Sequence, residues 1–300
     1  MRDETRSALL IALGGFVMLS LGDIIVKSMA GGWAGSAIAA LRYTIGAVGL
    51  AVLVAVRHGR AGFVCPRPWL QIGRGFGVAV ATLGFFMGVM VMPLADASAI
   101  VFTSPIWTLI FSMLFLGERP SAKTLAAIVL AFAGVIAILR PNVMELGLGA
   151  FWPLVAALGM SMLILLNRKA AGLAPGLVMQ FLVAAFGAPF LLLAAIAGHH
   201  AGAPGMVAGT PDWTIVARSA IVAVTATIGH WAIYSATTRA SAATVAPMTY
   251  VQLLVALAAG IALFGDIPDW PMLLGAGLIV GAGLLLWSAQ AKPAVIETPD

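Results

Sequence analysis

Ten stretches of apolar residues, each long enough to cross a lipid bilayer as a helix, occupy almost all of this 300-residue chain. A membrane-spanning helix needs about 20 mainly apolar residues. Only helices and closed barrels satisfy backbone hydrogen bonds within lipid, and these runs are too long and continuous for barrel strands. The sequence therefore predicts an all-α integral membrane protein with ten transmembrane helices, near residues 7–28, 34–56, 70–92, 95–116, 121–140, 149–167, 175–197, 213–236, 242–264 and 270–288.

The composition supports a membrane protein and excludes several other classes. Hydrophobic residues make up 62% of the chain, charged residues 9%, and the mean hydropathy is +1.07. A soluble surface needs roughly a quarter of the residues to be charged. The single cysteine, Cys65, excludes a disulfide framework and cysteine-based metal centres, and the chain lacks a phosphate-binding Gly-x-x-x-x-Gly-Lys loop. We expect neither a metal nor a cofactor.

An internal match divides the chain into two halves. The hexapeptide at residues 115–120, Phe-Leu-Gly-Glu-Arg-Pro, aligns with Leu-Phe-Gly-Asp-Ile-Pro at residues 263–268, and each joins the end of one apolar run to the next. The match predicts two five-helix repeats, at residues 1–145 and 146–290, before a disordered cytoplasmic tail at 291–300. Because five is odd, the second repeat enters the membrane inverted relative to the first, as in many secondary transporters.

The distribution of basic residues predicts the orientation. The N-terminal run resembles a secretory signal, but we expect it to remain as the first membrane helix. If both termini are cytoplasmic, twelve of the 16 Lys and Arg residues lie on the inner side, a strong positive-inside bias. This bias, with the anionic inner leaflet, accounts for the net charge of +5. We expect a multi-pass protein of the bacterial inner membrane, with the lipid bilayer but no nucleic acid as a partner.

Aromatic side chains mark the middle of the predicted bilayer. Most tryptophans lie at predicted helix ends, where interfacial belts occur, but Trp107 and Trp231 lie near mid-membrane by helical rise. His230 is too costly to leave against lipid. These positions predict a central cavity in which rings stack on an aromatic or apolar substrate. The alternative, that several of them pack between helices or face lipid, stays open. The predicted lining is Phe85, Phe86, Trp107, His230, Trp231, Tyr234, Tyr250 and Gln252.

Charged residues within the predicted helices form a second group. Asp23 and Lys27 lie one helical turn apart, and Arg42 lies in the outer third of the next helix. An isolated charge at that depth costs several kcal/mol, so Asp23 is expected to pair with Lys27 or Arg42. The remaining cation would then be available to attract a carboxylate. The alternative is a structural ion pair or an outer gate.

Prolines and glycines indicate where helices bend and pack. Pro105 and Pro247 lie in helices four and nine, which are repeat partners, and each removes a backbone hydrogen bond. We predict hinges at both prolines. The spacing Gly277-x-x-x-Gly281 permits close helix packing, either within the chain or in a weak homodimer.

These residues also carry a resemblance to a known family. Two halves of five short helices, Lys27, Arg42, and the Gly-Glu-Arg-Pro step at 117–120 resemble the drug/metabolite transporter superfamily. Within it, the chain is similar to the ten-helix EamA-type exporters and, more specifically, to bacterial aromatic amino-acid exporters. The second half departs from the pattern, because Ala184 lies near the place of a second arginine and Asp266 replaces glutamate.

The resemblance implies a secondary transporter and not an enzyme. It would export amino acids, with aromatic and other neutral ones favoured, by alternating access across the inner membrane. Efflux of another small metabolite or of a lipophilic cation is the alternative. A membrane channel or an intramembrane enzyme also stays open, although the sequence shows no cluster of acidic and histidine residues for metal or acid–base chemistry.

Overall fold

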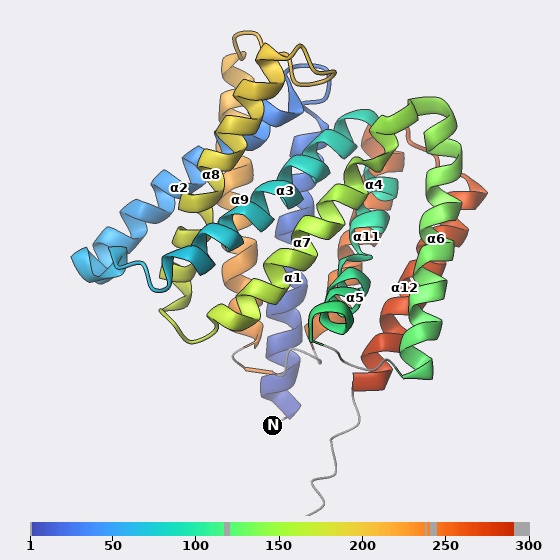
Figure 1. The fold of residues 1–300 in the computed structure, drawn as a ribbon, viewed down its shortest axis with the longest axis horizontal. Helices are drawn as coiled ribbons and strands as arrows, with labels where there is room; N and C mark the ends of the chain where they lie inside the picture. The colour runs from blue at the N-terminus through green and yellow to red at the C-terminus, as the bar shows by residue number, and fades with distance from the viewer. Residues whose placement is uncertain (1, 117–120, 238, 241–244, 291–300) are drawn as a thin grey trace, which may run out of the picture.

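The computed structural model describes residues 2–116, 121–237, 239–240 and 245–290, and within these ranges every regular element is helical (Figure 1). The predicted all-α membrane fold is confirmed. The predicted disordered tail and the Glu118-Arg119 turn lie outside the described residues.

Helices occupy all ten predicted runs. Within the described ranges, nine segments are long and apolar enough to cross a membrane, and Met248–Phe264 is a shorter apolar one. The first five runs contain α1 (Arg2–Lys27), α2 (Gly35–His58), the 3-10 turn η1 (Gly59–Phe63), α3 (Pro68–Val91), α4 (Leu94–Val101), α5 (Ser104–Leu116) and α6 (Ala122–Leu146). The last five contain η2 (Gly147–Phe151), α7 (Trp152–Ala170), α8 (Gly176–His200), α9 (Trp213–Thr237), η3 (Ala246–Tyr250), α11 (Val251–Ala259), the π-helical turn η4 (Gly260–Phe264) and α12 (Trp270–Gln290).

The bundle has two ends. We call the end where α1 begins and α12 finishes the lower end, and the opposite end, which carries the loop at residues 201–212, the upper end (Figure 1). The positive-inside prediction assigns the lower end to the cytoplasm. That orientation stays a prediction.

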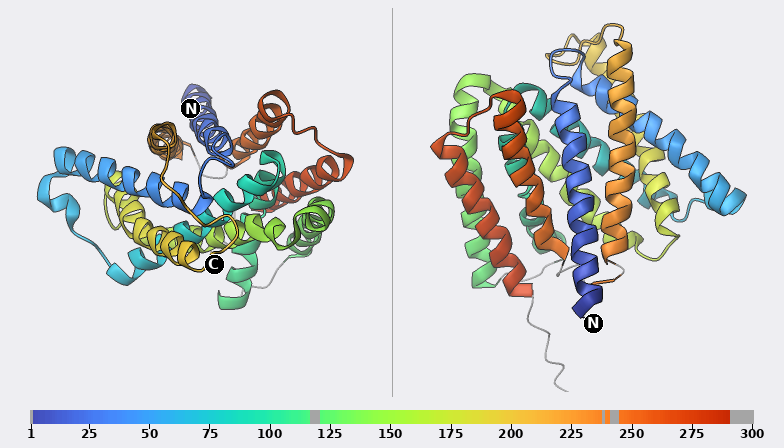
Figure 2. Two further views of the ribbon diagram at one scale, coloured as in Figure 1. Left: turned by 90° about the horizontal axis from the view of Figure 1, so that it is seen from above. Right: turned by 180° about the vertical axis from the view of Figure 1, so that it is seen from behind.

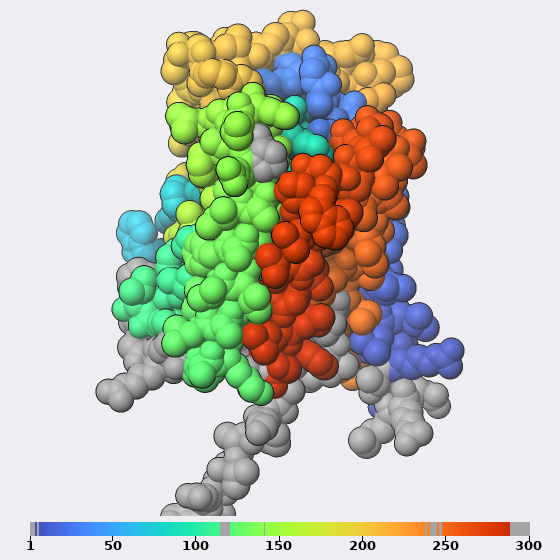
Figure 3. All heavy atoms as spheres, turned by 90° about the vertical axis from the view of Figure 1, so that its right-hand side faces the viewer, coloured from blue at the N-terminus to red at the C-terminus, as the bar shows by residue number. Residues whose placement is uncertain are grey.

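Helix pairing is reciprocal between the two predicted halves. The first helix of each half packs along the third helix of the other, as α1 with α9 and α7 with α3. The second helices pair as α2 with α8 and the fifth as α6 with α12, which lie side by side in Figure 3. Figure 2 shows α1 beside α9, and α1 runs toward the upper end whereas α7 runs toward the lower end. This pairing is what two inverted repeats related by a two-fold axis would produce. The predicted repeat boundary, between residues 145 and 146, falls at the end of α6 and stays a prediction.

Glycines allow the paired helices to approach closely. A Cβ atom built on Gly84 of α3 would lie 2.5 Å from the backbone nitrogen of Ala156 in α7. A Cβ atom on Gly159 of α7 would collide with the backbone of Ala81. Gly277 and Gly281 of α12, in contrast, have nothing within 4 Å of their Cβ positions, so they do not mediate packing within the described chain.

Helix four is broken where the sequence predicts a bend. The segment α4 ends at Val101 and α5 begins at Ser104. Pro105 explains the break, because its ring would clash with the carbonyl group of the residue four positions earlier, which is Val101. Pro247 lies near the start of the described part of helix nine, in η3, and residues 241–244 before it lie outside the described ranges. The hinge function of both prolines stays a prediction.

The second copy of the hexapeptide repeat forms a helix end. Gly265 has a φ of 70°, the left-handed conformation that favours glycine, and the amide nitrogen of Asp266 donates to the Gly260 carbonyl oxygen at 2.9 Å. Pro268 follows and cannot continue the helix. The repeated sequence is therefore, in this copy, a helix cap.

Candidate functional site

The guanidinium group of Arg42 is the most informative charged group inside the bundle. Its Cζ atom lies 5.0 Å from the ring centroid of Tyr43 and 5.5 Å from that of Phe86, which is on α3. Both distances are within the range of cation–π attraction. The hydroxyl group of Thr82, also on α3, donates to the Tyr43 hydroxyl oxygen at 3.2 Å. These contacts hold the Arg42 side chain between α2 and α3.

Two further helices bring titratable side chains within the electrostatic range of Arg42. They are Asp23 on α1 and His230 on α9. We call Asp23, Arg42, Tyr43, Phe86 and His230 the Arg42 cluster. Its side chains come from α1, α2, α3 and α9, and therefore from both predicted halves. The structure thus brings together Asp23, Arg42, Phe86 and His230 from among the predicted site residues.

The titratable side chains of the Arg42 cluster have accessible surface. Asp23 and Arg42 are half-buried and His230 is exposed. Among the described residues, neither Asp23 nor Arg42 has a hydrogen-bond or ion-pair partner. A charge turned toward lipid at this depth would be costly, whereas neighbours on three other helices surround Arg42.

Trp231 lies on a different face of α9 from its neighbour His230. The exposed fraction of the Trp231 side chain is 63%. Trp231 continues a row of exposed apolar side chains at helical spacing, which contains Ile221, Val224 and Ile228. The residues of α9 that approach α1, such as Gly229 and Thr225, lie on another face. Trp231 therefore continues the lipid-facing row, and we leave it out of the site. The neighbouring residues His230 and Trp231 can face different surroundings because successive residues of a helix point about 100° apart.

Other predicted lining residues lie against different helices. Trp107 packs edge-on against Phe132 of α6, with ring centroids 5.2 Å apart. Tyr234 lies against Gly176 at the lower end of α8, and Tyr250 packs on Phe102 and Gly283.

Gln252 and Phe85 make other contacts. Gln252, near Tyr250 in sequence, accepts a bond from the Thr249 hydroxyl group, and Phe85 packs edge-on against Phe86. The eight residues predicted as one lining are thus distributed over several helix contacts, and only Phe86 and His230 belong to the Arg42 cluster.

Lys27 belongs to a separate group at the upper end. Its ammonium nitrogen donates to the Met92 carbonyl oxygen at 2.6 Å and lies in the electrostatic field of Asp96 and Asp266. The side chain of Asn142 donates to Asp96 Oδ2 at 2.8 Å. We call Lys27, Asp96, Asn142 and Asp266 the upper-end cluster. It connects α1 to α4, α6 and the loop before α12.

The structure therefore divides the predicted outer charge cluster in two. No hydrogen bond or ion pair joins Asp23 to Lys27 or Arg42 among the described residues, so the predicted pairing stays a prediction. The predicted site did not include Asp96 or Asn142. An aspartate within a membrane helix is a signal that could have identified Asp96. Nothing in the sequence joins Asn142 to it, because the two residues lie on helices that meet only in the fold.

We expect substitution of Lys27 by methionine to lower the thermal stability of the purified protein. The change leaves the carboxylate of Asp266, whose Oδ2 atom is buried without a hydrogen-bond partner among the described residues, without its nearby cation. In a double-mutant cycle with Asp266→Asn, we expect a coupling energy of about 0.5–3 kcal/mol, measured by thermal unfolding in detergent. Arg218→Met, at an exposed arginine near the same end, is the control. Additive effects of Lys27→Met and Asp266→Asn would contradict the assignment.

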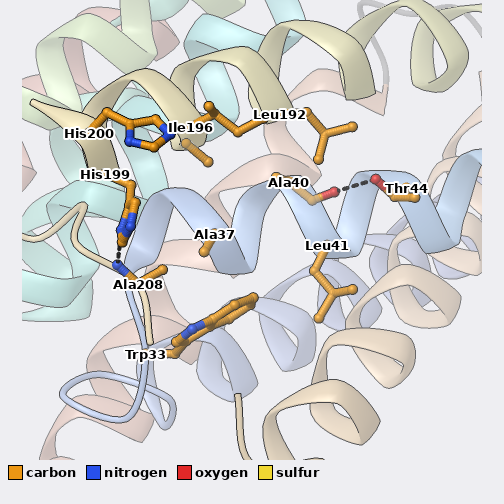
Figure 4. A pocket seen from close by; sticks show the side chains of 11 residues that line it. Trp33, Ala37, Ala40, Leu41, Thr44, Leu192, Ile196, His199, His200 and Ala208 are labelled. Atoms are coloured by element: carbon orange, nitrogen blue, oxygen red, sulfur yellow. Dashed lines mark hydrogen bonds between the residues drawn. The ribbon is translucent and has the colours of Figure 1, made fainter. Parts of the chain in front are cut away.

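A groove lies on a further face of α2. It has a volume of about 400 Å³ and separates parts of α2 and α8, with side chains pointing into it from both (Figure 4). Trp33 and His199 lie at one end, where the His199 Nδ1 atom accepts a bond from the Ala208 backbone nitrogen at 3.1 Å. The lining is mainly apolar and does not include Arg42. We therefore distinguish this groove from the candidate site.

Cys65 has no part in either cluster. It lies in the loop between η1 and α3, outside the membrane-spanning helices, and packs against the side chains between α2 and α8. Burial raises the pKa of its thiol group. A higher pKa lowers the fraction of reactive thiolate at neutral pH.

Comparison with known proteins agrees with this architecture. Residues 6–140 match the model of the EamA-like transporter family. A riboflavin transporter of Rhizobium johnstonii is 27% identical over 237 residues, which cover 79% of this chain and 76% of that protein. An S-adenosylmethionine uptake transporter of Rickettsia conorii is 23% identical over 280 residues, which cover 92% of this chain and 90% of that protein.

A crystal structure of a protein also matches over 96% of this chain and 99% of its own, with a TM-score of 0.58 and 19% sequence identity. At this identity, the likeness concerns the fold alone. Together with the bundle of membrane-spanning helices, the relatives named as transporters support a membrane transporter of small molecules. The family match over residues 6–140 and the relatives named as transporters support an EamA-type transporter of the drug/metabolite transporter superfamily.

Proposed function

We propose that this protein is a secondary carrier that moves a small metabolite across the bacterial inner membrane by alternating access, with the Arg42 cluster as its binding site. The observation that carries the proposal is the accessible guanidinium group of Arg42, which has no hydrogen-bond acceptor among the described residues. Five N–H donors without an acceptor inside a membrane protein favour binding of an anionic group.

The relatives support a metabolite carrier more than the predicted export of aromatic amino acids. Those reported above are named for riboflavin and for S-adenosylmethionine. Riboflavin is a planar ring compound, and S-adenosylmethionine combines a ring with charged groups. The aromatic side chains beside Arg42 suit ring compounds of either kind. Amino acids remain among the candidate substrates, and export, cytoplasmic termini and a weak homodimer remain sequence predictions.

Counterflow in proteoliposomes tests the proposal. Vesicles containing the purified protein are loaded with one unlabelled compound, and entry of the same compound in labelled form is followed. The panel contains riboflavin, S-adenosylmethionine, phenylalanine, tryptophan and the lipophilic cation tetraphenylphosphonium. We expect saturable exchange of at least one compound. If the folded protein exchanges none of them, the proposal is wrong.

A pair of neighbouring substitutions tests the location of the site. We expect His230→Ala to reduce the counterflow rate of the exchanged compound about fivefold, because one hydrogen-bonding group worth roughly 1 kcal/mol is lost. Trp231→Ala is the matched control, since it changes the next residue of the same helix on the lipid-facing row. Its rate should stay close to that of the wild type. A larger loss for Trp231→Ala than for His230→Ala would place the site on the other face of α9.

A further inference from the structure

The groove between α2 and α8 opens toward the lipid. Its lining residue Ala37 lies about two and a half helical turns before Gly46, and therefore on the opposite face of α2. The face of Gly46 is turned to α9, because its Cβ position lies 3.9 Å from the Cβ atom of Ala223. On α8, the lining residues Leu192 and Ile196 are exposed and apolar. Such side chains on a membrane-spanning helix match lipid tails, which are as apolar as leucine.

The two helices are close at the lower end and apart at the upper end. Near the lower end, Val54 of α2 and Val178 and Leu182 of α8 form one buried cluster. Near the upper end, the groove has a volume of about 400 Å³, within the range of small-ligand sites. An empty space of this size would cost its walls their dispersion contacts, and a mainly apolar lining offers water few partners. We therefore expect an apolar component of the bilayer to fill it.

The length of the groove fits within one leaflet of the bilayer. Its lining extends from Ala37 to Thr44 on α2 and from His200 to Leu192 on α8, which helical rise converts to about 10 Å and about 12 Å. The two histidines of the lining lie at one end of the groove and Thr44 lies at the other (Figure 4). The hydrocarbon core of a bilayer is about 30 Å thick, so each leaflet contributes about 15 Å. The groove therefore suits part of one acyl chain of the upper leaflet.

The upper end of the groove offers a hydrogen-bond donor. The Nδ1 atom of His199 accepts a bond from the Ala208 backbone nitrogen at 3.1 Å. In a neutral imidazole this leaves the proton on Nε2, which is then a donor. The indole nitrogen of Trp33 donates to the Gly209 carbonyl oxygen at 2.8 Å, at a helix end where interfacial tryptophans occur. A donor above an apolar groove suits a phospholipid, because its phosphate and ester oxygens accept hydrogen bonds and its chains are apolar.

From these observations we propose that the groove binds one phospholipid of the upper leaflet, with an acyl chain between α2 and α8 and the headgroup oxygens at His199. Since α2 and α8 belong to different predicted halves, a bound lipid contacts both halves of the bundle. The proposal goes beyond the carrier function and does not depend on it, because lipid binding is measured without transport.

A photoreactive lipid tests the proposal. Phosphatidylglycerol with a diazirine group in one acyl chain is added to the purified protein in detergent and irradiated, and the labelled peptides are identified by mass spectrometry. For the wild type, we expect saturable labelling of the peptides of α2 and α8 that contain Leu41 and Leu192, and we expect unlabelled phosphatidylglycerol to displace the label. Lipids that only surround the protein give labelling that does not saturate.

Two tryptophan substitutions on α8 distinguish the groove from the rest of the lipid-facing surface. Ile196→Trp places a larger side chain in the groove, and we expect the apparent affinity for the labelled lipid to fall at least about tenfold. Leu193→Trp, at an exposed residue of α8 outside the lining, is the matched control, and its affinity should equal that of the wild type. If Ile196→Trp fails to fold, Leu41→Trp fills the same groove from α2.

Substitution of His199 tests the position of the headgroup. We expect His199→Ala to weaken lipid binding about fivefold, as the loss of one hydrogen bond predicts. His199→Gln keeps both a donor and an acceptor, so it should restore most of the affinity. Equal affinities for the wild type and a folded His199→Ala variant would reject the placement of the headgroup at His199.

Three results would overturn the lipid site itself. The first is wild-type labelling that does not saturate, or equal affinities for folded Ile196→Trp and Leu193→Trp variants. The second is displacement of the label by a compound of the counterflow panel but not by unlabelled phosphatidylglycerol, which would assign the groove to the substrate. The third is a changed oligomeric state of Ile196→Trp in size-exclusion chromatography with unchanged labelling, which would assign the groove to a second copy of the chain.

Discussion

Replacing Arg42 by glutamine is expected to slow substrate counterflow at least about tenfold. Hydrogen bonds to charged groups contribute roughly 1.5–3 kcal/mol, and about 1.4 kcal/mol corresponds to a factor of ten. Arg42 has accessible surface, no hydrogen-bond acceptor among the described residues and two aromatic rings that hold it in place. The substitution removes the positive charge but retains a polar side chain. The measurement is the initial counterflow rate in proteoliposomes that contain equal amounts of folded protein.

Two further variants separate the charge of Arg42 from its geometry. Arg42→Lys keeps the positive charge but lacks the planar arrangement of donors, so we expect a rate between those of the wild type and Arg42→Gln. Arg218→Gln removes an exposed arginine that donates to the Ser28 carbonyl oxygen at 3.2 Å, and its rate should match the wild type. A wild-type rate for folded Arg42→Gln would show that the Arg42 cluster does not bind the substrate.

The largest expected loss of stability comes from adding a single methyl group to Gly159. Its Cβ atom would meet the backbone of Gly77 and Ala81 on α3, and backbone atoms cannot move aside as a flexible side chain can. Overpacking costs typically about 1–3 kcal/mol, and we expect Gly159→Ala to be at the upper end because α3 and α7 must separate. Thermal unfolding and size-exclusion chromatography in detergent measure the effect.

Gly277→Ala is the matched control for this substitution. Gly277 also lies in a membrane helix, but nothing lies within 4 Å of its Cβ position. Alanine has a higher helix propensity than glycine by about 1 kcal/mol, so this variant should be as stable as the wild type or slightly more stable. Equal melting temperatures for Gly159→Ala and Gly277→Ala would show that the close contact of α3 and α7 does not limit stability.

The position of the helices could be predicted because it depends on local properties of the chain. Apolar runs of about 20 residues indicate spanning helices wherever they occur. The break before Pro105 could be predicted for the same reason, since it follows from the clash of the proline ring with the preceding turn. The end of helix nine at Gly265 and Pro268 is another local signal, because glycine adopts the left-handed conformation that caps the helix.

The site could be predicted only in part, because helical rise gives the depth of a side chain but not the direction in which it points. His230 and Trp231 have nearly the same depth, yet His230 lies near Arg42 and Trp231 lies among exposed apolar side chains. A polar environment for His230 could be expected from the cost of exposing it to lipid. Tryptophan is tolerated both in a binding site and against lipid, so its residue type alone does not distinguish the two faces.

Local properties of the sequence were enough to identify a helical membrane protein, the approximate positions of its helices, and the charged residues that lie within them. These properties follow from hydropathy and backbone chemistry over short stretches of the chain. The packing of the helices, in contrast, places Asp23 and His230 in the electrostatic field of Arg42, and Lys27 in that of Asp96 and Asp266. The neighbours of each charged side chain depend on which helices, distant in the sequence, pack together. This packing depends in turn on the close glycine contacts between paired helices.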